Sequence, residues 1–251
     1  VVYFNSIFNC VRNNHNIKMA ASGKTALIVF AHPEPKSFNG AMKDKSVEVL
    51  EEMGMEVIVS DLYAMKFNPV SSRENFKTVH DPDFLKLQLE EGKASEEDGF
   101  AEDIKAEHEK LKKADLVIFH FPLWWFSCPA IMKGWWDRVA AYGTAYGGGK
   151  WYERGEFAGK KGIVAVTTGG PEMMYTKDGI NGDMGDTLLW HINHGMFWFT
   201  GVKPLPHFAV WGPARMTPDT RTENLEKWGE HVKQWDTMEP LDYKNASEFG
   251  M

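Results

Sequence analysis

A tryptophan-rich stretch near the middle of the chain carries side chains well suited to binding a flat ligand. Residues 116–139 read LVIFHFPLWWFSCPAIMKGWWDRV, in which Pro122, Trp124, Trp125, Phe126 and Pro129 gather directly after an apolar run. Prolines at these positions stop the segment from continuing as a central strand, and rings of this size pack against flat partners. The pattern suits a planar heteroaromatic cofactor. A tryptophan-rich core would explain the composition equally well.

A second candidate segment, HPEPKSFN at residues 32–39, follows the apolar run TALIVFA. Ser37 can cap a helix here, and the first amides of such a helix, together with Asn39, can cradle a phosphate. His32 beside a phosphate is a hydrogen-bond donor in this interpretation. The chain has neither a G-x-G-x-x-G after this run nor a P-loop sequence, which disfavours a Rossmann dinucleotide site and a P-loop nucleotidase. An ordinary capped turn remains an equal alternative.

A third segment, Thr167-Thr168-Gly169-Gly170, follows another apolar run. Glycines at such a point let backbone amides approach a flat ligand closely. Taken alone, the segment is also typical of a flexible turn, but the three segments together predict one site.

The elements that would position these segments alternate along the chain. Short apolar runs predict five buried parallel strands, and amphipathic or apolar patterns between them predict helices. This alternation indicates a doubly wound α/β sheet, whose ligands bind at the carboxyl ends of the strands. The predicted strands are Thr25–Ala31, Glu56–Ser60, Ala114–Phe121, Gly162–Thr168 and Pro206–Trp211. The predicted helices are Phe38–Met53, Glu96–Lys113, Ala130–Ala141, Leu188–Thr200 and Pro218–Trp235, and Tyr63–Asp98 is expected to be a polar insertion.

Length and composition predict one domain in a reducing compartment. The 251 residues carry a net charge of −7 with both signs interspersed, which argues against nucleic acid or an acidic membrane as partner. Two cysteines, Cys10 and Cys128, argue against a disulfide framework, and the expected location is the cytoplasm. No apolar run is long enough to span a membrane. We expect residues 1–18 to be an extension without a signal peptide, and residues 19–251 to form the domain.

Several segments resemble the FAD-dependent NAD(P)H:quinone reductases, the DT-diaphorase family. The resemblance covers about residues 25–249 and rests on AHPEPKSFNGAM, SDLYAMKFNP, ADLVIFHFPLWWFSCPAIMKGWWDRV, TTGGPEMMYTKDGINGDM and WDTMEPL. It implies a flavodoxin-like fold with strand order 2-1-3-4-5 and helices on both faces. It also implies bound FAD and a homodimer whose active sites lie between the subunits.

The resemblance assigns residues by motif. FAD would be bound by His32, Ser37, Phe38, Asn39, Pro122, Leu123, Trp125, Phe126, Asp137, Thr167, Thr168, Gly169, Gly170, Tyr175 and Arg221. The substrate pocket would use Trp125, Phe126, Gly169, Gly170, Met174 and Asn181, with Tyr146 and Phe249 contributed by the partner chain.

The family reaction is the two-electron reduction of quinones to hydroquinones. This reaction implies a role in detoxification. Hydride passes from a dihydronicotinamide to flavin N5 and then to a quinone in the same slot, by ping-pong kinetics. Negative charge that develops near flavin N1 calls for a hydrogen-bond donor, for which Tyr175 is the candidate. Asn181 stands where many relatives have histidine, and this resembles the branch that prefers dihydronicotinamide riboside over NADH and NADPH. Trp124 stands where relatives often have glutamine. Gly148 stands where they have a second pocket tyrosine, so the glycine-rich loop at residues 146–149 is expected to be more open.

Other readings stay open or are less favoured. A flavin-binding regulatory subunit with weak turnover would share this fold, and so would an FMN-dependent NAD(P)H reductase. His191 and His194 form H-x-x-H, and some relatives bind zinc near here, but Trp198 replaces the second histidine and no metal is predicted. Cys128 is expected to pack as a small hydrophobe.

Overall fold

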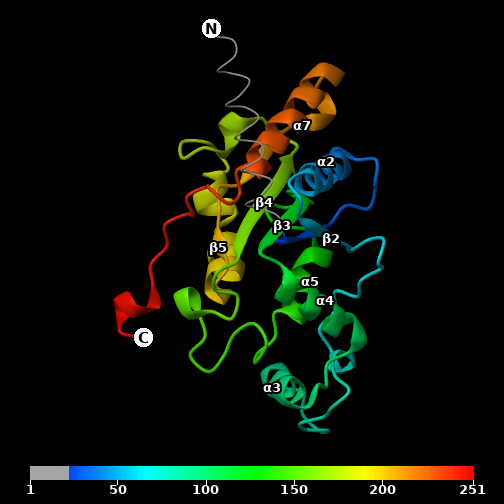
Figure 1. The fold of residues 1–251 in the computed structure, drawn as a ribbon, viewed down its shortest axis with the longest axis vertical. Coiled ribbons are helices and arrows are strands. Elements are labelled where there is room, and N and C mark those ends of the chain that lie inside the picture. Colours follow the sequence, from blue (N-terminus) through cyan, green and yellow to red (C-terminus); the bar gives the residue numbers. More distant parts are fainter. Residues whose placement is uncertain (1–22) are drawn as a thin grey trace.

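The computed structural model describes residues 23–251, and a parallel sheet lies at its centre, with its middle strands buried (Figure 1). The sheet order is β2-β1-β3-β4, and β5 and β6 both pair with β4. All pairings are parallel. The strands are β1 (Thr25–Phe30), β2 (Glu56–Asp61), β3 (Leu116–Pro122), β4 (Lys161–Thr168), β5 (Lys203–Pro204) and β6 (Phe208–Trp211). The predicted flavodoxin-like order is confirmed.

The fifth strand position differs from its prediction, Pro206–Trp211. Two short strands occupy it, and Leu205, Pro206 and His207 separate them. Proline has no backbone N–H to donate to a ladder, so Pro206 interrupts pairing at this edge. The sequence pattern identified only the longer piece, β6.

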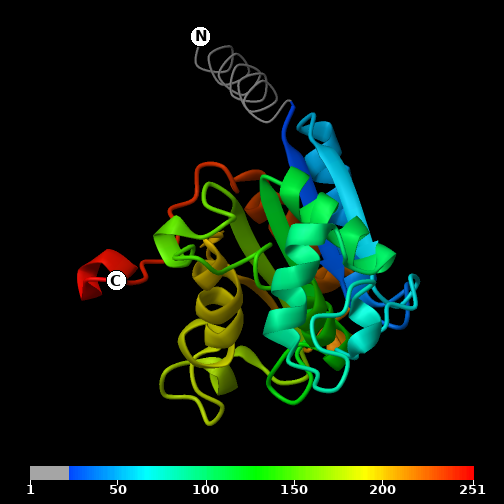
Figure 2. The ribbon, with the colours of Figure 1, turned by 90° about the horizontal axis from the view of Figure 1, so that it is seen from below.

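Helices cover both faces of the sheet, as expected (Figures 1 and 2). On one face α2 and α7 pack on Ala26, Ile28 and Ile118 through Met42 and Trp228. A second buried cluster joins the opposite face of the strands to α4, α5 and the helical segment that contains α6. Strand residues alternate between the two clusters because successive side chains point to opposite faces. The helices are α2 (Phe38–Glu52), α3 (Leu87–Glu97), α4 (Glu102–Lys113), α5 (Ala130–Val139), α6 (Trp190–Ile192) and α7 (Pro218–Lys233).

The helix predicted over Glu96–Lys113 is wrong at its start. α3 ends at Asp98, which adopts a left-handed conformation with φ 55°, and α4 begins four residues later. The charged run Glu96-Glu97-Asp98 therefore ends one helix instead of starting another. The expected polar insertion, Tyr63–Asp98, accordingly contains α3, which buries Glu90, Glu91 and Ala94.

The helix predicted over Leu188–Thr200 buries one side, including Ile192 and Phe197, and exposes Trp190, but it is not a regular α-helix. α6 supplies one short α-helical turn, π-helical turns span Met184–Leu188 and Asn193–Phe197, and a 3₁₀ turn spans Trp198–Thr200. Extra residues per turn re-aim bulky side chains, which occurs frequently near functional sites. The expected extension, residues 1–18, lies outside the described residues.

Candidate functional site

The loop between β1 and α2 is arranged by its own side chains. Nδ1 of His32 lies 3.0 Å from the Glu34 amide nitrogen and 3.1 Å from the Glu34 carbonyl oxygen, so only Nδ1 is tied to the loop. Ser37 caps α2 and accepts a hydrogen bond from the Gly40 amide at 3.1 Å. The first amides of a helix have no acceptor within it. The loop therefore presents backbone donors and an imidazole edge together.

Asn39 contains the clearest unsatisfied group at this edge. Its amide nitrogen donates to Thr167 Oγ1 at 2.7 Å, joining α2 to the end of β4. The residue is 3% exposed, yet its side-chain oxygen has no hydrogen-bond partner within residues 23–251. A buried acceptor without a partner costs free energy, so this oxygen is suited to receive a donor from a ligand.

A cavity of about 420 Å³ opens beside these groups. His32, Lys36 and Arg221 are its ionisable lining residues, and no Asp or Glu lines it. The Arg221 side chain is held by hydrogen bonds from Nη2 and Nε to the Met216 carbonyl at 3.1 and 3.3 Å. Cationic side chains next to free helix amides favour an anionic ligand. The lining residues are His32, Lys36, Ser37, Phe38, Asn39, Ala41, Pro122, Thr167, Pro213, Ala214, Arg221, Thr222 and Leu225.

A strained turn at the end of β3 displays the aromatic residues. The amides of Trp124 and Ser127 each donate to the other residue's carbonyl, at 3.0 and 3.1 Å, so Trp125 and Phe126 are the two central residues of the turn. Both have positive φ, 52° and 61°. That conformation is ordinary for glycine and costs other residues about 1–2 kcal/mol each.

The turn exposes its rings instead of burying them. Trp125 is 95% exposed and Phe126 is 50% exposed, whereas Trp135 and Trp136, later in the same stretch, lie in the core. The tryptophan-rich core is confirmed for Trp135 and Trp136, whereas Trp125 and Phe126 stay predicted to bind a planar cofactor. Strain together with exposure is typical of a binding element.

The end of β4 forms the third wall. The Leu123 amide donates to the Thr167 carbonyl at 2.8 Å, which places the β3 and β4 loops side by side. The Thr168 hydroxyl donates to the Gly170 carbonyl at 2.8 Å. A Cβ atom at Gly170 would lie 3.0 Å from the Tyr175 ring and its hydroxyl oxygen, so only glycine fits against Tyr175 without a shift.

Tyr175 is fixed by stacking. Its ring lies on Trp211, with centroids 5.3 Å apart and planes 26° apart, and the residue is 9% exposed. The nearby Asn181 amide donates to the Met174 carbonyl at 2.9 Å, so these two predicted pocket residues are joined by the backbone.

The sequence analysis did not identify two positively charged residues at this edge of the sheet. Lys36 lines the cavity, and Arg215 donates to the Gly169 carbonyl. Arg215 follows β6, which shares the fifth strand position with β5. A search of every loop at the carboxyl edge of the sheet would therefore have found it.

Asp137, Tyr146 and Phe249 are predicted site residues that belong neither to the cavity lining nor to the turns beside it. Asp137, on α5, pairs with Lys133 Nζ at 2.6 Å and does not line the cavity. The Tyr146 hydroxyl accepts a hydrogen bond from Gln88 Nε2 at 3.3 Å, and Phe249 is 69% exposed near the end of the sequence. Their assignments to the FAD site and to a partner's pocket stay predictions.

The two histidines of H-x-x-H make separate contacts. His191 Nε2 lies 2.9 Å from Ser127 Oγ, and His194 stacks on Trp190 with ring centroids 4.4 Å apart. Burial lowers the pKa of both. Between residues 23 and 251, no group of three or more His, Cys, Asp or Glu could hold a metal ion. Cys128 is buried, and that burial raises the pKa of its thiol.

The described part of the chain contains no helix that is both long and apolar enough to cross a membrane.

Comparison with known proteins matches the whole region that carries this site. A family profile described as a flavodoxin-like fold matches residues 24–233. NAD(P)H dehydrogenase (quinone) 1 of Cavia porcellus is 42% identical over 92% of this chain and 84% of the relative. Ribosyldihydronicotinamide dehydrogenase (quinone) of Homo sapiens is 40% identical over 91% of this chain and 99% of the relative. A solved structure described as a quinone reductase from Klebsiella pneumoniae superposes with a TM-score of 0.85 at 37% identity, covering 89% of each chain.

Proposed function

Because the chain belongs to the flavodoxin-like family of NAD(P)H:quinone reductases, we propose that it reduces quinones to hydroquinones with a dihydronicotinamide as hydride donor and FAD as cofactor. One observation carries the proposal. A cation-lined cavity, with Asn39, whose side-chain oxygen is unsatisfied, among the lining residues, opens beside a strained turn that exposes Trp125 and Phe126.

The residues present fit the two chemically different ends of FAD. His32, Lys36, Arg221 and the first amides of α2 would bind the diphosphate. The Asn39 oxygen would accept a hydrogen bond from a ligand hydroxyl or amine. The exposed rings of the β3 turn and the backbone of Gly169 and Gly170 would bind the flat ring system.

A bound flavin supplies a ring that accepts hydride from one flat substrate and passes it to the next. The protein's contribution is orientation and hydrogen bonding. The phenol of Tyr175, held between Trp211 and Gly170, would donate a hydrogen bond to the side of the ring where negative charge develops. Because Trp211 fixes the ring, that donor needs little rearrangement during the reaction.

The donor preference is proposed from Asn181. An amide side chain can only offer neutral hydrogen bonds, whereas a histidine could become a cation and attract the phosphates of NADH or NADPH. Asn181 therefore favours a small donor of the dihydronicotinamide riboside type.

The site is proposed to be completed by a second copy of the chain. Tyr146 and Phe249 lie outside the cavity of their own chain, and Phe249 exposes most of its ring. A homodimer in which each chain supplies these two residues to its partner would account for both. Two cysteines in 251 residues suit a reducing compartment, and we propose a cytosolic enzyme that detoxifies quinones.

The test is a steady-state assay of purified protein with menadione and, in turn, NADH, NADPH and dihydronicotinamide riboside. We expect yellow protein that releases FAD on denaturation, and the highest kcat/KM with the riboside. Released FMN would replace the cofactor assignment. Bound flavin with negligible quinone-dependent turnover would instead favour a regulatory flavoprotein, and colourless protein that takes up neither flavin would contradict the proposal.

A further inference from the structure

The last segment of the chain, residues 240–251, forms an arm that projects from the body in both views (Figures 1 and 2). The arm ends in a short 3₁₀ helix, η8 (Ala246–Phe249). Phe249 is 69% exposed and Met251 is 59% exposed. The arm thus presents apolar side chains away from the core of its own chain.

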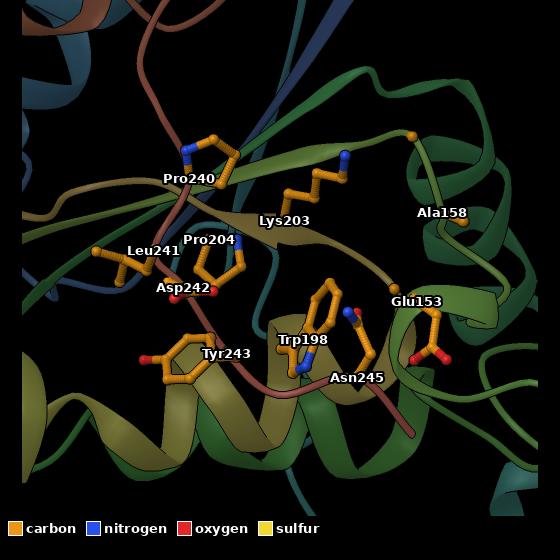
Figure 3. Close-up of a pocket in the computed structure, with 12 residues that line it drawn as sticks. Glu153, Ala158, Trp198, Lys203, Pro204, Pro240, Leu241, Asp242, Tyr243 and Asn245 are labelled. Atoms are coloured by element: carbon orange, nitrogen blue, oxygen red, sulfur yellow. The ribbon is translucent and has the colours of Figure 1, made fainter. Parts of the chain in front are cut away.

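Packing alone does not hold the arm in place. A cavity of about 390 Å³ lies between the arm and the body, with Trp198, Lys203 and Tyr243 in its walls (Figure 3). A second cavity of about 320 Å³, lined by residues that include Tyr152 and Phe249, lies beside η8. Tyr243 packs edge-on against Trp190 and His194, with ring centroids 5.3 Å apart in each pair, but the cavity beside η8 leaves Phe249 and Met251 largely exposed.

Hydrogen bonds from a second 3₁₀ turn, η2 (Tyr152–Arg154), hold the arm instead. The Glu153 carboxylate accepts from the Ala246 amide at 2.8 Å and the Ser247 amide at 3.0 Å. Arg154 Nη2 donates to the Met251 carbonyl at 2.8 Å. Farther back, Trp198 Nε1 donates to the Lys244 carbonyl at 3.0 Å.

Glu153 and Arg154 therefore hold the two ends of η8, on which Phe249 lies. Bonds from a charged carboxylate to amides are stronger than neutral ones. Burial raises the pKa of the Glu153 carboxyl, but the amide donors outweigh it and keep that pKa below its ordinary value. The carboxylate form, which accepts both amides, is the one favoured at neutral pH.

We propose that Glu153 and Arg154 are positioning residues that hold Phe249 where it can close the acceptor pocket of a second copy of the chain. This inference rests on the proposed function, which makes the site a shared one. Loss of either residue would free η8, so the phenyl ring would no longer be presented at one fixed place and a bound quinone would lose a contact.

The experiment uses the full chain and compares Glu153→Ala and Arg154→Ala with Phe249→Ala. The matched control is Glu156→Gln, because Glu156 lies near η2 but pairs with Lys150 Nζ at 2.7 Å and does not contact the arm. We expect Glu153→Ala and Phe249→Ala each to raise KM for menadione about 5-fold or more, with kcat changed by less than about 2-fold. Arg154→Lys should restore part of what Arg154→Ala loses, and Glu156→Gln should match the unmodified protein.

A double-mutant cycle separates positioning from general structural damage. If Glu153 acts through Phe249, then Glu153→Ala should cause no further rise in KM once Phe249 is alanine. Additive effects in the double variant, or an unchanged KM in Glu153→Ala, would overturn the proposal.

Hydrogen exchange tests the contact without using activity. The Ala246 and Ser247 amides should be protected in the unmodified protein and in Glu156→Gln, and should exchange faster in Glu153→Ala. Equal exchange in all three would also overturn the proposal. The flavin content of each variant is measured in parallel, so failure of the proposed function, seen as colourless unmodified protein, is distinguished from failure of the positioning role.

Discussion

Strand β3 connects two regions in which polar side chains have different roles. Near its carboxyl end lies a buried joint, formed by Ser46, His120 and Trp228 at the contact of β3 with α2 and α7. Beyond it lies the rim, the loops that follow β1, β3 and β4. The joint is closed, with Ser46, His120 and Trp228 all 0% exposed. The rim contains an unsatisfied Asn39 oxygen and the 95% exposed Trp125.

The hydrogen bonds of the joint form a consistent set. The Ser46 hydroxyl donates to the Met42 carbonyl at 3.0 Å and accepts from Trp228 Nε1 at 2.9 Å. His120 Nε2 lies 2.9 Å from the same hydroxyl oxygen. Because the single hydroxyl proton points to Met42, His120 Nε2 must donate. Burial lowers the pKa of His120 and keeps its ring neutral, so Nδ1, which has no hydrogen-bond partner within residues 23–251, is unprotonated. Apart from His120 Nδ1, the joint uses its polar groups to fix packing, whereas the rim keeps groups available for a ligand.

The largest expected effect is a loss of folding stability when the joint is disrupted. Trp228→Ala removes a fully buried ring and two donor contacts, and we expect it to lower the free energy of unfolding by about 3–5 kcal/mol. Urea denaturation followed by circular dichroism measures this. The paired variant Trp125→Ala, on the rim, should stay within about 0.5 kcal/mol of the unmodified protein. Similar losses in the two variants would remove the distinction between the regions.

Acid should weaken the joint through His120. Burial first, and then the Lys43 charge, lower the pKa of His120 from 6.5 to about 3. The unfolded state therefore binds this proton more readily, so the contribution to stability is complete above pH 6.5 and is lost as the pH falls toward 3. At pH 5 the loss from this residue is about 2 kcal/mol.

Other histidines whose pKa is lowered by partial burial, such as His108 and His207, change stability in the same direction, so a variant must isolate His120. His120→Phe retains a ring against Trp228 and cannot be protonated. Unfolding measured at pH 8 and pH 5 should show a smaller acid loss in this variant, and an equal loss would contradict the assigned pKa shift.

On the rim, removal of the Tyr175 hydroxyl group should slow the reduction of the flavin. Tyr175→Phe keeps the stacking on Trp211 and loses only the donor. We expect flavin reduction by the dihydronicotinamide to slow about 10-fold or more, which corresponds to about 1.4 kcal/mol. Stopped-flow absorbance measures the rate, and FAD content and unfolding free energy serve as controls. An unchanged rate would exclude Tyr175 from the mechanism.

The smallest predicted effect concerns the backbone strain of the turn that follows β3. Removing this strain tests whether the rim is held in an unfavourable conformation. Trp125 has φ 52° and almost no packing to lose, so Trp125→Gly should raise the free energy of unfolding by about 0.5 kcal/mol relative to Trp125→Ala. Both variants should bind quinones more weakly because each lacks the ring. If glycine is no more stable than alanine, the turn is not strained.

The candidate site could be located from the sequence because parallel strands end at one edge of the sheet. Apolar runs identified the strands, and the three segments predicted at their carboxyl ends supply seven of the thirteen cavity-lining residues, including His32, Asn39 and Thr167. Five others follow β6, where the sequence had identified only Arg221. Lys36 and Arg215 were missed because an exposed cation has no periodicity that marks it. Charge pattern also failed to place the helix start predicted at Glu96, because the run Glu96-Glu97-Asp98 ends α3 and α4 begins only at Glu102.

The sequence by itself determined the alternation of strands and helices, the sheet edge that carries the site and the family, since these follow from local apolar periodicity and from motifs in order. Only the tertiary structure decided which tryptophans are core and which are displayed, because Trp125 and Trp135 have the same side chain and differ in the backbone that carries them. It also joined Glu153 to Ala246 and Asn39 to Thr167. Contacts between residues so far apart in the chain depend on how the layers pack, and no local pattern contains that information.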